Sequence, residues 1–268
     1  KQIRPFILRR KKMDVTKDLP DKMENNIFVE LTDEQKKIYV AELEKVKKEI
    51  DDILKQGGEK KAAFLILPLL TKLRQICIDP KIVYPEYTGG SNKIDSLIYV
   101  IKENIANGNK ILMFTSFKDA MNDVIGHLEK EDIPYYTISG EVSSKERMRR
   151  VDEFNERKDT AVFLIMLKAG GIGLNLASAS TVIHLDLWWN PQAENQATDR
   201  AHRIGQTKTV EVIHIVAKGT IEEKILELQK KKLKLSEKLI DGEIRDKDIL
   251  SSLSEKDIRE LLSNENKD

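Results

Sequence analysis

The spacing of hydrophobic residues predicts a long amphipathic helix in the first third of the chain. Thr32 and Gln35 fit a capping box at its start, in which the threonine hydroxyl and the glutamine side chain each satisfy a free amide. Gly57 and Gly58 predict its end. Apolar residues follow at alternating intervals of four and three, which places them on one helix face: Tyr39, Leu43, Val46, Ile50 and Ile53.

A second apolar stretch covers residues 62–78. Pro68 inside it predicts a kink or a split, because proline lacks an amide hydrogen and clashes with the preceding turn. Residues 25–31 alternate enough for a short strand. The N-terminal third is therefore predicted to be mostly helical.

From about Asn92 onward, helix and strand signals alternate, which predicts crossover units and a parallel sheet. Expected strands fall within residues 110–116, 135–138, 161–167, 181–187 and 210–216, and expected helices within 93–106, 117–128, 144–156, 192–204, 220–240 and from about 254. The runs at 161–167 and 181–187 are continuously apolar, as in strands buried on both faces. We predict an α/β fold in which helices flank a parallel sheet, with an added helical subdomain in the N-terminal third.

The composition limits the partners and the cellular compartment that the chain can have. The 46 Lys and Arg nearly balance 45 Asp and Glu, for a net charge of +1, so nucleic acid would bind a local patch and not a general polycation. The single cysteine, Cys77, cannot form an internal disulfide, which favours a reducing intracellular compartment. No apolar run is long enough to span a membrane, and no His, Cys and Asp cluster has metal-ligand spacing. The chain begins without methionine, so we expect it to be a segment of a longer protein.

Glycines follow the strand predicted at residues 161–167. Gly170, Gly171 and Gly173 permit close approach of a bulky group, and a helix opening there would attract phosphate through its free amides. Taken alone, glycines after a strand are more often simple turns.

Three polar residues in the helix predicted at 192–204 share a helix face. Gln196, Arg200 and Arg203 lie at i, i+4 and i+7. Neighbouring guanidinium groups repel each other unless an anion or carboxylates lie opposite them. A solvated charged face is the simpler interpretation, but the helix directly follows a parallel strand, where such sheets bind ligands. Before it, Trp188 and Trp189 would point to opposite faces if the strand continued.

These segments together resemble the Swi/Snf family within the superfamily two helicases, and the similarity covers nearly the whole chain. QATDRAHRIGQ resembles motif VI, LKAGGIGLNL motif V, GNKILMFTSF motif IV and ISGEVSSKERMRRVDEFN motif IVa; DLWWNP, LRQICIDP and RPFILRRKKMDVTKDLP match further family segments in order. The chain departs from the usual pattern at Asp79, Met166 and Ser180, where the family commonly has histidine, serine and aspartate.

The resemblance implies the second RecA-like lobe of a two-lobe motor. Residues 1–85 would form the lobe junction and helical subdomain, 86–220 the RecA-like lobe, and 221–268 a brace helix and tail. Arg200 and Arg203 would be arginine fingers that reach the γ-phosphate of ATP on the first lobe, and Gln196 would position them. Gly173 and Asn175 would approach the nucleotide ribose.

The same resemblance implies contacts with the DNA backbone, which would be largely independent of sequence. The implied contact residues are Thr115, Ser116, Gly140, Arg147 and Lys168. Implied partners are double-stranded DNA, the chain's own N-terminal ATPase lobe and a DNA-bound protein target. Chromatin remodelling or recombination and repair would be the setting, in the cytoplasm or nucleoid of a prokaryote or the nucleus of a eukaryote.

The chain lacks the features that hold a nucleotide's phosphates and metal. A P-loop needs Gly-Lys-Ser or Gly-Lys-Thr, and neither occurs; Asp33-Glu34 opens a helix instead of ending a buried strand. ATP and Mg²⁺ would therefore bind mainly to the N-terminal lobe. We expect a DNA-dependent ATPase when the lobes are joined, and no activity from this chain alone.

Two alternatives remain open. A strand-separating helicase of the same superfamily would share most of these motifs, although the combination of LRQIC with WWNP and the helical N-terminal third favours a translocase. A non-enzymatic docking module for DNA or protein would not need Arg200 and Arg203.

Overall fold

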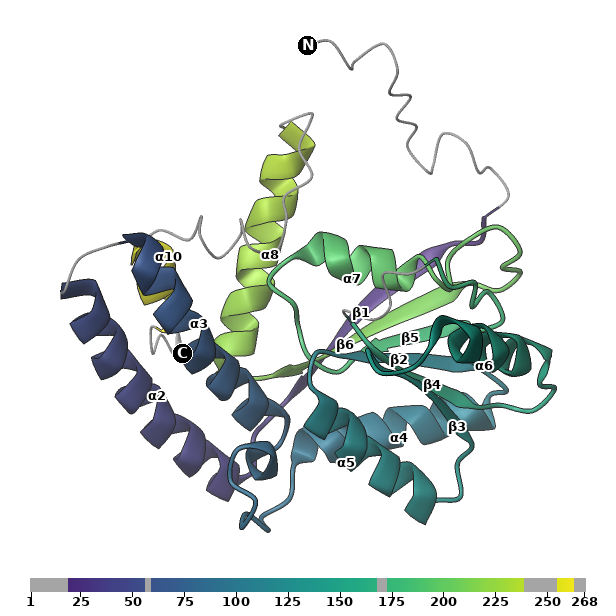
Figure 1. Ribbon diagram of the computed structural model, residues 1–268, viewed down its shortest axis with the longest axis horizontal. Helices are drawn as coiled ribbons and strands as arrows, with labels where there is room; N and C mark the ends of the chain where they lie inside the picture. The colour runs from purple at the N-terminus through teal and green to yellow at the C-terminus, as the bar shows by residue number, and fades with distance from the viewer. Residues whose placement is uncertain (1–18, 56–58, 168–172, 239–254, 263–268) are drawn as a thin grey trace.

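The computed structural model describes residues 19–55, 59–167, 173–238 and 255–262, and its centre is a six-stranded parallel sheet (Figure 1). The strand order is β1-β6-β5-β2-β4-β3. The strands are β1 (Lys22–Val29), β2 (Ile111–Thr115), β3 (Tyr135–Ile138), β4 (Val162–Met166), β5 (Thr181–His184) and β6 (Val210–Ala217). This architecture confirms the predicted α/β fold.

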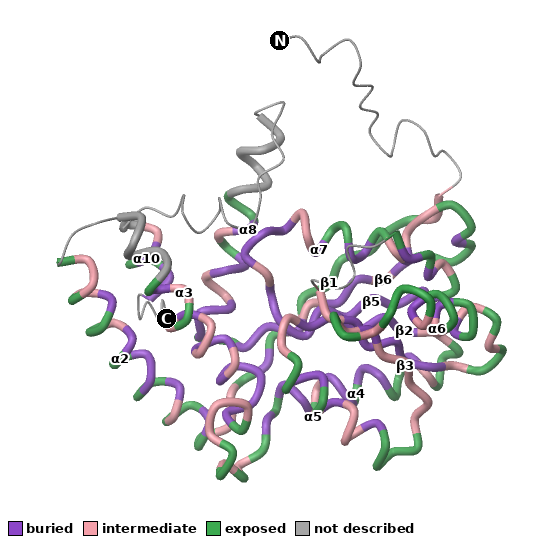
Figure 2. The backbone as a smooth tube through the Cα atoms, viewed as in Figure 1, coloured by how far each residue is buried: buried purple, intermediate pink, exposed green. Residues whose placement is uncertain are grey.

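Helices cover both faces of the sheet (Figure 1). One face packs against α4 (Asn92–Ala106) and α5 (Lys118–Lys130), and the other against α6 (Ser144–Glu156) and α7 (Pro191–Thr198). Along β2, Ile111 and Met113 join the first core while Leu112 and Phe114 join the second. Strands β2 and β5 are accordingly buried along their whole length, and β4 is buried except at its last residue (Figure 2). This burial explains their unbroken apolar sequence.

Strand β1 comes from the N-terminal third but completes the sheet. All eight of its residues pair in parallel with β6, from Lys22 opposite Val210 to Val29 opposite Ala217. The strand begins three residues before the alternating pattern in the sequence. Residues 22–29 therefore belong to the sheet of the expected RecA-like lobe, although they precede the boundary that was expected at residue 85.

Most of the described residues between β1 and Ile78 are helical, as predicted. Helices α2 (Asp33–Lys55) and α3 (Glu59–Ile78) pack together with α8 (Ile221–Lys238) and α10 (Glu255–Leu261) around one apolar core. The capping box of α2 is present: Gln35 N donates to Thr32 Oγ1 at 3.1 Å, and Thr32 N donates to Gln35 Oε1 at 3.4 Å. No helix in the described residues is both long and apolar enough to cross a bilayer.

Helix α3 continues through Pro68, so of the expected kink or split, the split is wrong. Pro68 is exposed, whereas Ile66, Leu70 and Leu73 on either side of it are buried in the core shared with α2. Burial of that apolar face outweighs the amide hydrogen bond that proline removes.

Replacing Pro68 with alanine is expected to raise the free energy of unfolding by about 2 kcal/mol. Proline costs about 3 kcal/mol relative to alanine inside a helix, and roughly 0.4–1 kcal/mol is returned because proline also restricts the unfolded chain. Urea denaturation would measure the change, with Leu65→Ala, at another exposed position of α3, as the control expected to change little. An unchanged or lower stability for Pro68→Ala would contradict this account.

A buried ion pair joins the subdomain to the sheet. Lys93 Nζ on α4 lies 2.5 Å from Glu222 Oε2 on α8, and both side chains are fully buried. Glu222 also accepts a hydrogen bond from Ala217 N at 2.8 Å, and Tyr39 Oη accepts one from Ile221 N at 2.7 Å. The start of α8 is thereby held by α2, α4 and β6 together.

Candidate nucleotide and DNA-binding site

Helix α7 is shorter than predicted, which changes how its polar residues are presented. Asn190 caps it, accepting from Gln192 N at 3.0 Å, but the helix ends at Thr198 and not at Ile204. Arg200 and Arg203 consequently lie in the turns that follow. The expectation that they share a helix face with Gln196 is wrong, and Gln196 is an exposed residue on α7.

The two arginines lie against the segment after β4. Arg200 O accepts from Leu176 N at 3.0 Å, and Arg203 Nη1 donates to Leu174 O at 3.1 Å. These contacts bring Gly173 and Asn175, which flank Leu174, close to the arginines. Gly173 is exposed with open space around its Cα, and Asn175 is exposed with its carbonyl accepting from Asn155 Nδ2 at 2.8 Å. Lys168, Gly170 and Gly171 lie outside the described residues.

The loop after α7, which carries Arg200 and Arg203, lies at the amino edge of the sheet. The sequence had predicted the carboxyl edge, where parallel sheets bind ligands. Helix α7 begins beyond the carboxyl end of β5 and runs back across the sheet (Figure 1). Its end therefore lies near the amino ends of the strands, where His202 Nε2 is 2.8 Å from Pro20 O, just before β1. The sequence indicated only where the helix starts, whereas its direction decides where the arginines lie.

The paired guanidinium groups are only partly satisfied. Arg200 and Arg203 are both half-buried, and Arg200 Nε is buried with no hydrogen-bond partner. Burial, followed by the charge of Arg203, lowers the pKa of Arg200, although Asp199 acts in the opposite direction. Neither arginine forms an ion pair with a carboxylate in the described part of the chain. This arrangement suits an incoming anion, because its charge would relieve the repulsion between the two groups.

Three of the predicted DNA contacts lie at the carboxyl edge of the sheet. Thr115 ends β2, Ser116 follows it, and Gly140 follows β3. The Thr115 side chain is only 1% exposed, and its hydroxyl lies 2.7 Å from Asp186 Oδ1. Ser116 N donates to the same oxygen at 2.9 Å. The Thr115 hydroxyl is therefore occupied within the protein, whereas Ser116 Oγ is buried and has no hydrogen-bond partner.

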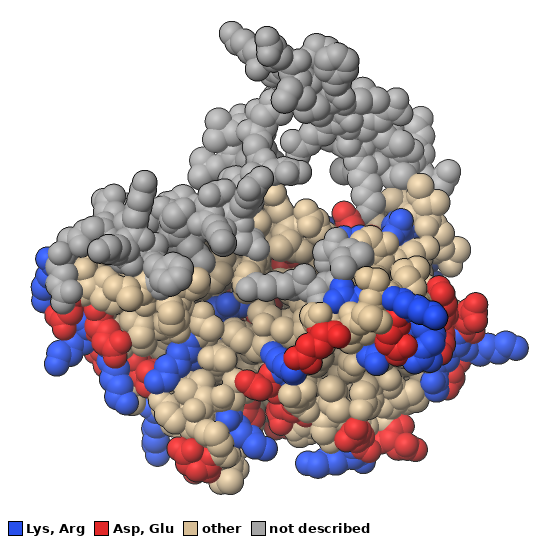
Figure 3. All heavy atoms as spheres, in the orientation of Figure 1, with Lys and Arg blue, Asp and Glu red and all other residues tan. Residues whose placement is uncertain are grey.

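Arg147 holds a loop together instead of extending from the surface. It is 8% exposed, and its guanidinium donates to the carbonyl oxygens of Val142 at 2.8 Å, Ser139 at 3.1 Å and Gly140 at 3.3 Å. Its charge is thus placed beneath Gly140. On the visible face of the molecule, acidic and basic side chains alternate without a broad basic patch (Figure 3).

Sequence reasoning missed a buried ion pair beside this turn. Arg74 Nη2 on α3 lies 2.7 Å from Asp186 Oδ2, and the two side chains are 1% and 0% exposed. Both tryptophan rings lie near the Arg74 guanidinium, with centroids 5.3 Å (Trp188) and 5.5 Å (Trp189) away. The available signal was the presence of LRQIC and DLWWNP in one chain, since Arg74 belongs to the first and Asp186 to the second.

The tryptophans do not occupy opposite faces of a strand, because β5 ends at His184. Trp189 is buried among the helices of the N-terminal core, and Trp188 is half-buried. His184 is buried, and the half-buried His214 stacks on it with ring centroids 5.0 Å apart.

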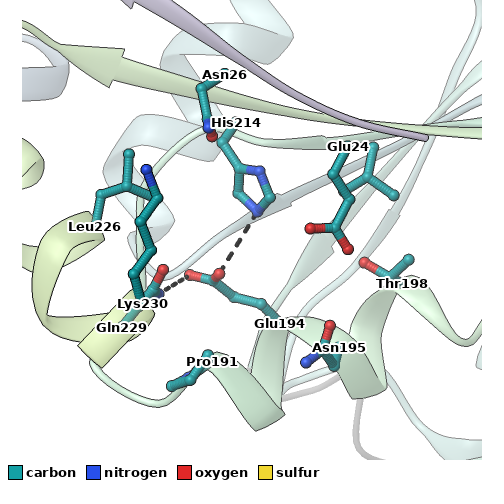
Figure 4. Close-up of a pocket in the computed structure, with 11 residues that line it drawn as sticks. Glu24, Asn26, Pro191, Glu194, Asn195, Thr198, His214, Leu226, Gln229 and Lys230 are labelled. Atoms are coloured by element: carbon teal, nitrogen blue, oxygen red, sulfur yellow. Dashed lines mark hydrogen bonds and ion pairs between the residues drawn. The ribbon is translucent and has the colours of Figure 1, made fainter. Parts of the chain in front are cut away.

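A pocket of about 110 Å³ lies where β1, β6, α7 and α8 meet (Figure 4). Glu194 is at its centre, with one carboxylate oxygen 3.0 Å from Gln229 Nε2 and the other 3.6 Å from His214 Nε2. None of the predicted site residues lines this pocket. Among the described residues, no group of three or more His, Cys, Asp and Glu side chains could hold a metal ion.

Comparisons with known proteins match the same segments to helicase and SNF2 families. Residues 92–205 match the helicase conserved C-terminal domain, and residues 1–82 match the SNF2-related domain. The chain is 40% identical to an uncharacterized ATP-dependent helicase of Mycoplasma pneumoniae over 96% of its own length and 24% of that protein. It is 36% identical to the ISWI chromatin-remodeling complex ATPase ISW2 of Saccharomyces cerevisiae over 89% of its length and 22% of that protein. The chain thus spans about a quarter of the curated relatives that it matches.

Solved structures extend the match. The Sulfolobus solfataricus SWI2/SNF2 ATPase core in complex with dsDNA superimposes with a TM-score of 0.71 at 36% identity, over 97% of this chain and 54% of that one. The C-terminal domain of the Sulfolobus solfataricus SWI2/SNF2 ATPase gives a TM-score of 0.71 at 31% identity, over 91% of this chain and 99% of that one. The fold is therefore RecA-like, and the chain belongs to the Swi/Snf family of helicase-like ATPases.

Proposed function

We propose that this chain is the second motor lobe of an ATP-dependent double-stranded DNA translocase. The observation that carries the proposal is the half-buried pair Arg200 and Arg203, with which no carboxylate of the described residues forms an ion pair. Planar guanidinium groups match the oxygens of a transferring phosphoryl group and balance the charge that develops on it. In this proposal both arginines act on the γ-phosphate of ATP held by the N-terminal lobe.

The nucleotide would lie between the two lobes. Gly173 leaves open space beside the arginines, and Asn175 is exposed next to it, so this segment can approach the ribose. Gln196 would position the phosphate from α7. The sequence contains no Gly-Lys-Ser or Gly-Lys-Thr, so the phosphate cradle and the Mg²⁺ ligands belong to the other lobe.

DNA would contact the opposite edge of the sheet. Ser116 and Gly140 lie in turns after β2 and β3, the two strands on either side of β4, and Arg147 places a positive charge beneath Gly140. Lys168 is included because of the family resemblance alone. These groups can contact phosphates without reading bases. Because the nucleotide and DNA groups lie at opposite edges, closure of the lobes on ATP would move the edge that grips the DNA.

A direct test separates the chain from the complete ATPase. The chain alone is expected to show no ATP turnover above background, and joining it to its N-terminal lobe is expected to give hydrolysis that double-stranded DNA stimulates. A steady-state phosphate-release assay measures both. Turnover by the chain alone that is lost in Arg203→Ala would refute the proposed division of the site.

The complete ATPase would then be tested for the kind of movement it produces. A translocase is expected to displace a third strand from a DNA triplex while leaving an ordinary duplex paired. The helical subdomain, held to the DNA-binding edge through Arg74, favours this activity over strand separation. Efficient unwinding of a forked duplex would instead support the helicase alternative, and displacement of a DNA-bound protein would identify the target class.

A further inference from the structure

Asp186 lies where three segments distant in the sequence meet. Its Oδ1 atom accepts hydrogen bonds from Thr115 Oγ1 at 2.7 Å and from Ser116 N at 2.9 Å. Its Oδ2 atom accepts from Arg74 Nη2 at 2.7 Å. One buried carboxylate therefore holds both the end of β2 and a helix of the N-terminal subdomain.

Arg74 strengthens this connection from the opposite side. The same Nη2 atom lies 2.6 Å from Leu187 O, and the guanidinium lies 5.1 Å from the centroid of the Phe117 ring. Phe117 N also lies 3.3 Å from Thr115 Oγ1. The turn from Thr115 to Phe117 is thus held through its backbone and its side chains, and the helical subdomain supplies part of that support.

Ser116 is the half-buried member of this turn, and its side chain makes no hydrogen bond within the protein. Its amide is used by Asp186, but its hydroxyl is buried and has no hydrogen-bond partner. An unsatisfied buried hydroxyl is costly, so a phosphate oxygen that accepts from it would gain more than it would from a solvated serine. Holding the turn in advance also lowers the entropy lost on binding.

We propose that Thr115, Asp186 and Arg74 are positioning residues that hold the Ser116 turn for one phosphate of the DNA backbone. This inference rests on the proposed function. It assigns Thr115 a role through Ser116 instead of a direct contact with DNA, and it makes the helical subdomain part of the DNA-binding apparatus.

The test compares Thr115→Val, which keeps the shape but removes the hydroxyl, with Thr115→Ser, which keeps the hydroxyl. Both are made in the complete ATPase. Thr115→Val is expected to raise the DNA concentration for half-maximal ATPase about tenfold, with kcat at saturating DNA within about twofold of the unsubstituted enzyme. The dependence of log binding constant on log salt should become shallower by about 1, the value for one lost phosphate contact. Thr115→Ser should restore all three quantities.

A double-mutant cycle tests whether Thr115 acts through Ser116. Once Ser116→Ala has removed the phosphate contact, adding Thr115→Val is expected to weaken DNA binding little further, because coupled residues are not additive. Fully additive losses would overturn the proposal. The proposal would also be overturned if Thr115→Val lowered Tm but left the DNA concentration for half-maximal ATPase unchanged. Unchanged DNA binding in Ser116→Ala would overturn it as well. Absence of DNA-stimulated hydrolysis in the unsubstituted ATPase would instead overturn the proposed function itself.

Discussion

Replacing Arg203 with alanine in the complete ATPase is expected to lower kcat for DNA-stimulated ATP hydrolysis by about 10³-fold or more. An arginine that contacts the transferring phosphoryl group contributes roughly 10³–10⁵ in rate in related phosphoryl-transfer systems. Arg203 lies in a turn at the edge of the sheet opposite Ser116 and Gly140, so DNA affinity should change little. Arg203→Lys keeps the charge but loses the planar fork of donors, and it should recover only a small part of the rate.

The measurement is steady-state ATPase activity at saturating DNA, paired with DNA binding in the absence of ATP. Arg149 offers a matched control, because it is exposed and pairs with Glu146 and Glu153 on its own helix; Arg149→Ala should retain nearly full activity. Arg200→Ala is expected to lose rate in the same way as Arg203→Ala. If both arginines prove dispensable, the chain acts as a docking module and not as a motor lobe.

Replacing Lys93 with methionine is expected to lower the free energy of unfolding by about 3–5 kcal/mol. Removing one member of a buried ion pair leaves the other charge without compensation, and here Glu222 is completely buried. Methionine fills much of the lysine volume, so the loss would come from the unpaired carboxylate. Chemical denaturation measures it. Lys218→Met, which breaks the exposed pair with Glu30, should change stability by less than about 1 kcal/mol.

The pH dependence of the stability lost in Lys93→Met identifies the cause of that loss. Burial raises the pKa of Glu222 above its usual 4.5, and Lys93 opposes the shift. A carboxyl with a raised pKa in the folded state binds more protons folded than unfolded, so stability falls as pH rises from the unfolded pKa through the folded pKa. Without Lys93 this window should extend upward. The deficit of Lys93→Met should be smallest near pH 4.5 and grow toward neutral pH, and a deficit independent of pH would indicate lost packing instead.

A companion substitution adds a second check on this interpretation. In Lys93→Met with Glu222→Gln, the carboxamide oxygen can still accept from Ala217 N while no charge is buried. This double variant should be more stable at neutral pH than Lys93→Met alone. Equal stability of the two variants would show that the unpaired charge is not what destabilises the protein.

The chain's local patterns were enough to predict its secondary elements and their α/β arrangement. The capping box at Thr32 and Gln35, the apolar runs of β4 and β5, and the alternation of helices with strands depend on residues close together in the sequence. Helix α6 has the bounds Ser144–Glu156 that were expected for it, because its cap and its apolar residues all lie within its own sequence. The similarity to Swi/Snf segments also identified the arginines and glycines by type and order.

Only the tertiary structure decided where these groups lie. Helix α7 ends at Thr198, and the turn after it is bonded to the segment before β5 through Leu176 N and Arg200 O, so Arg200 and Arg203 lie in turns at the amino edge of the sheet. Asp186 meets Arg74 across 112 residues of sequence, and β1 joins β6 across nearly 190. Such contacts depend on how complete elements pack against one another. Periodicity records which face of an element is buried, but it carries no information about the distant residue that covers it.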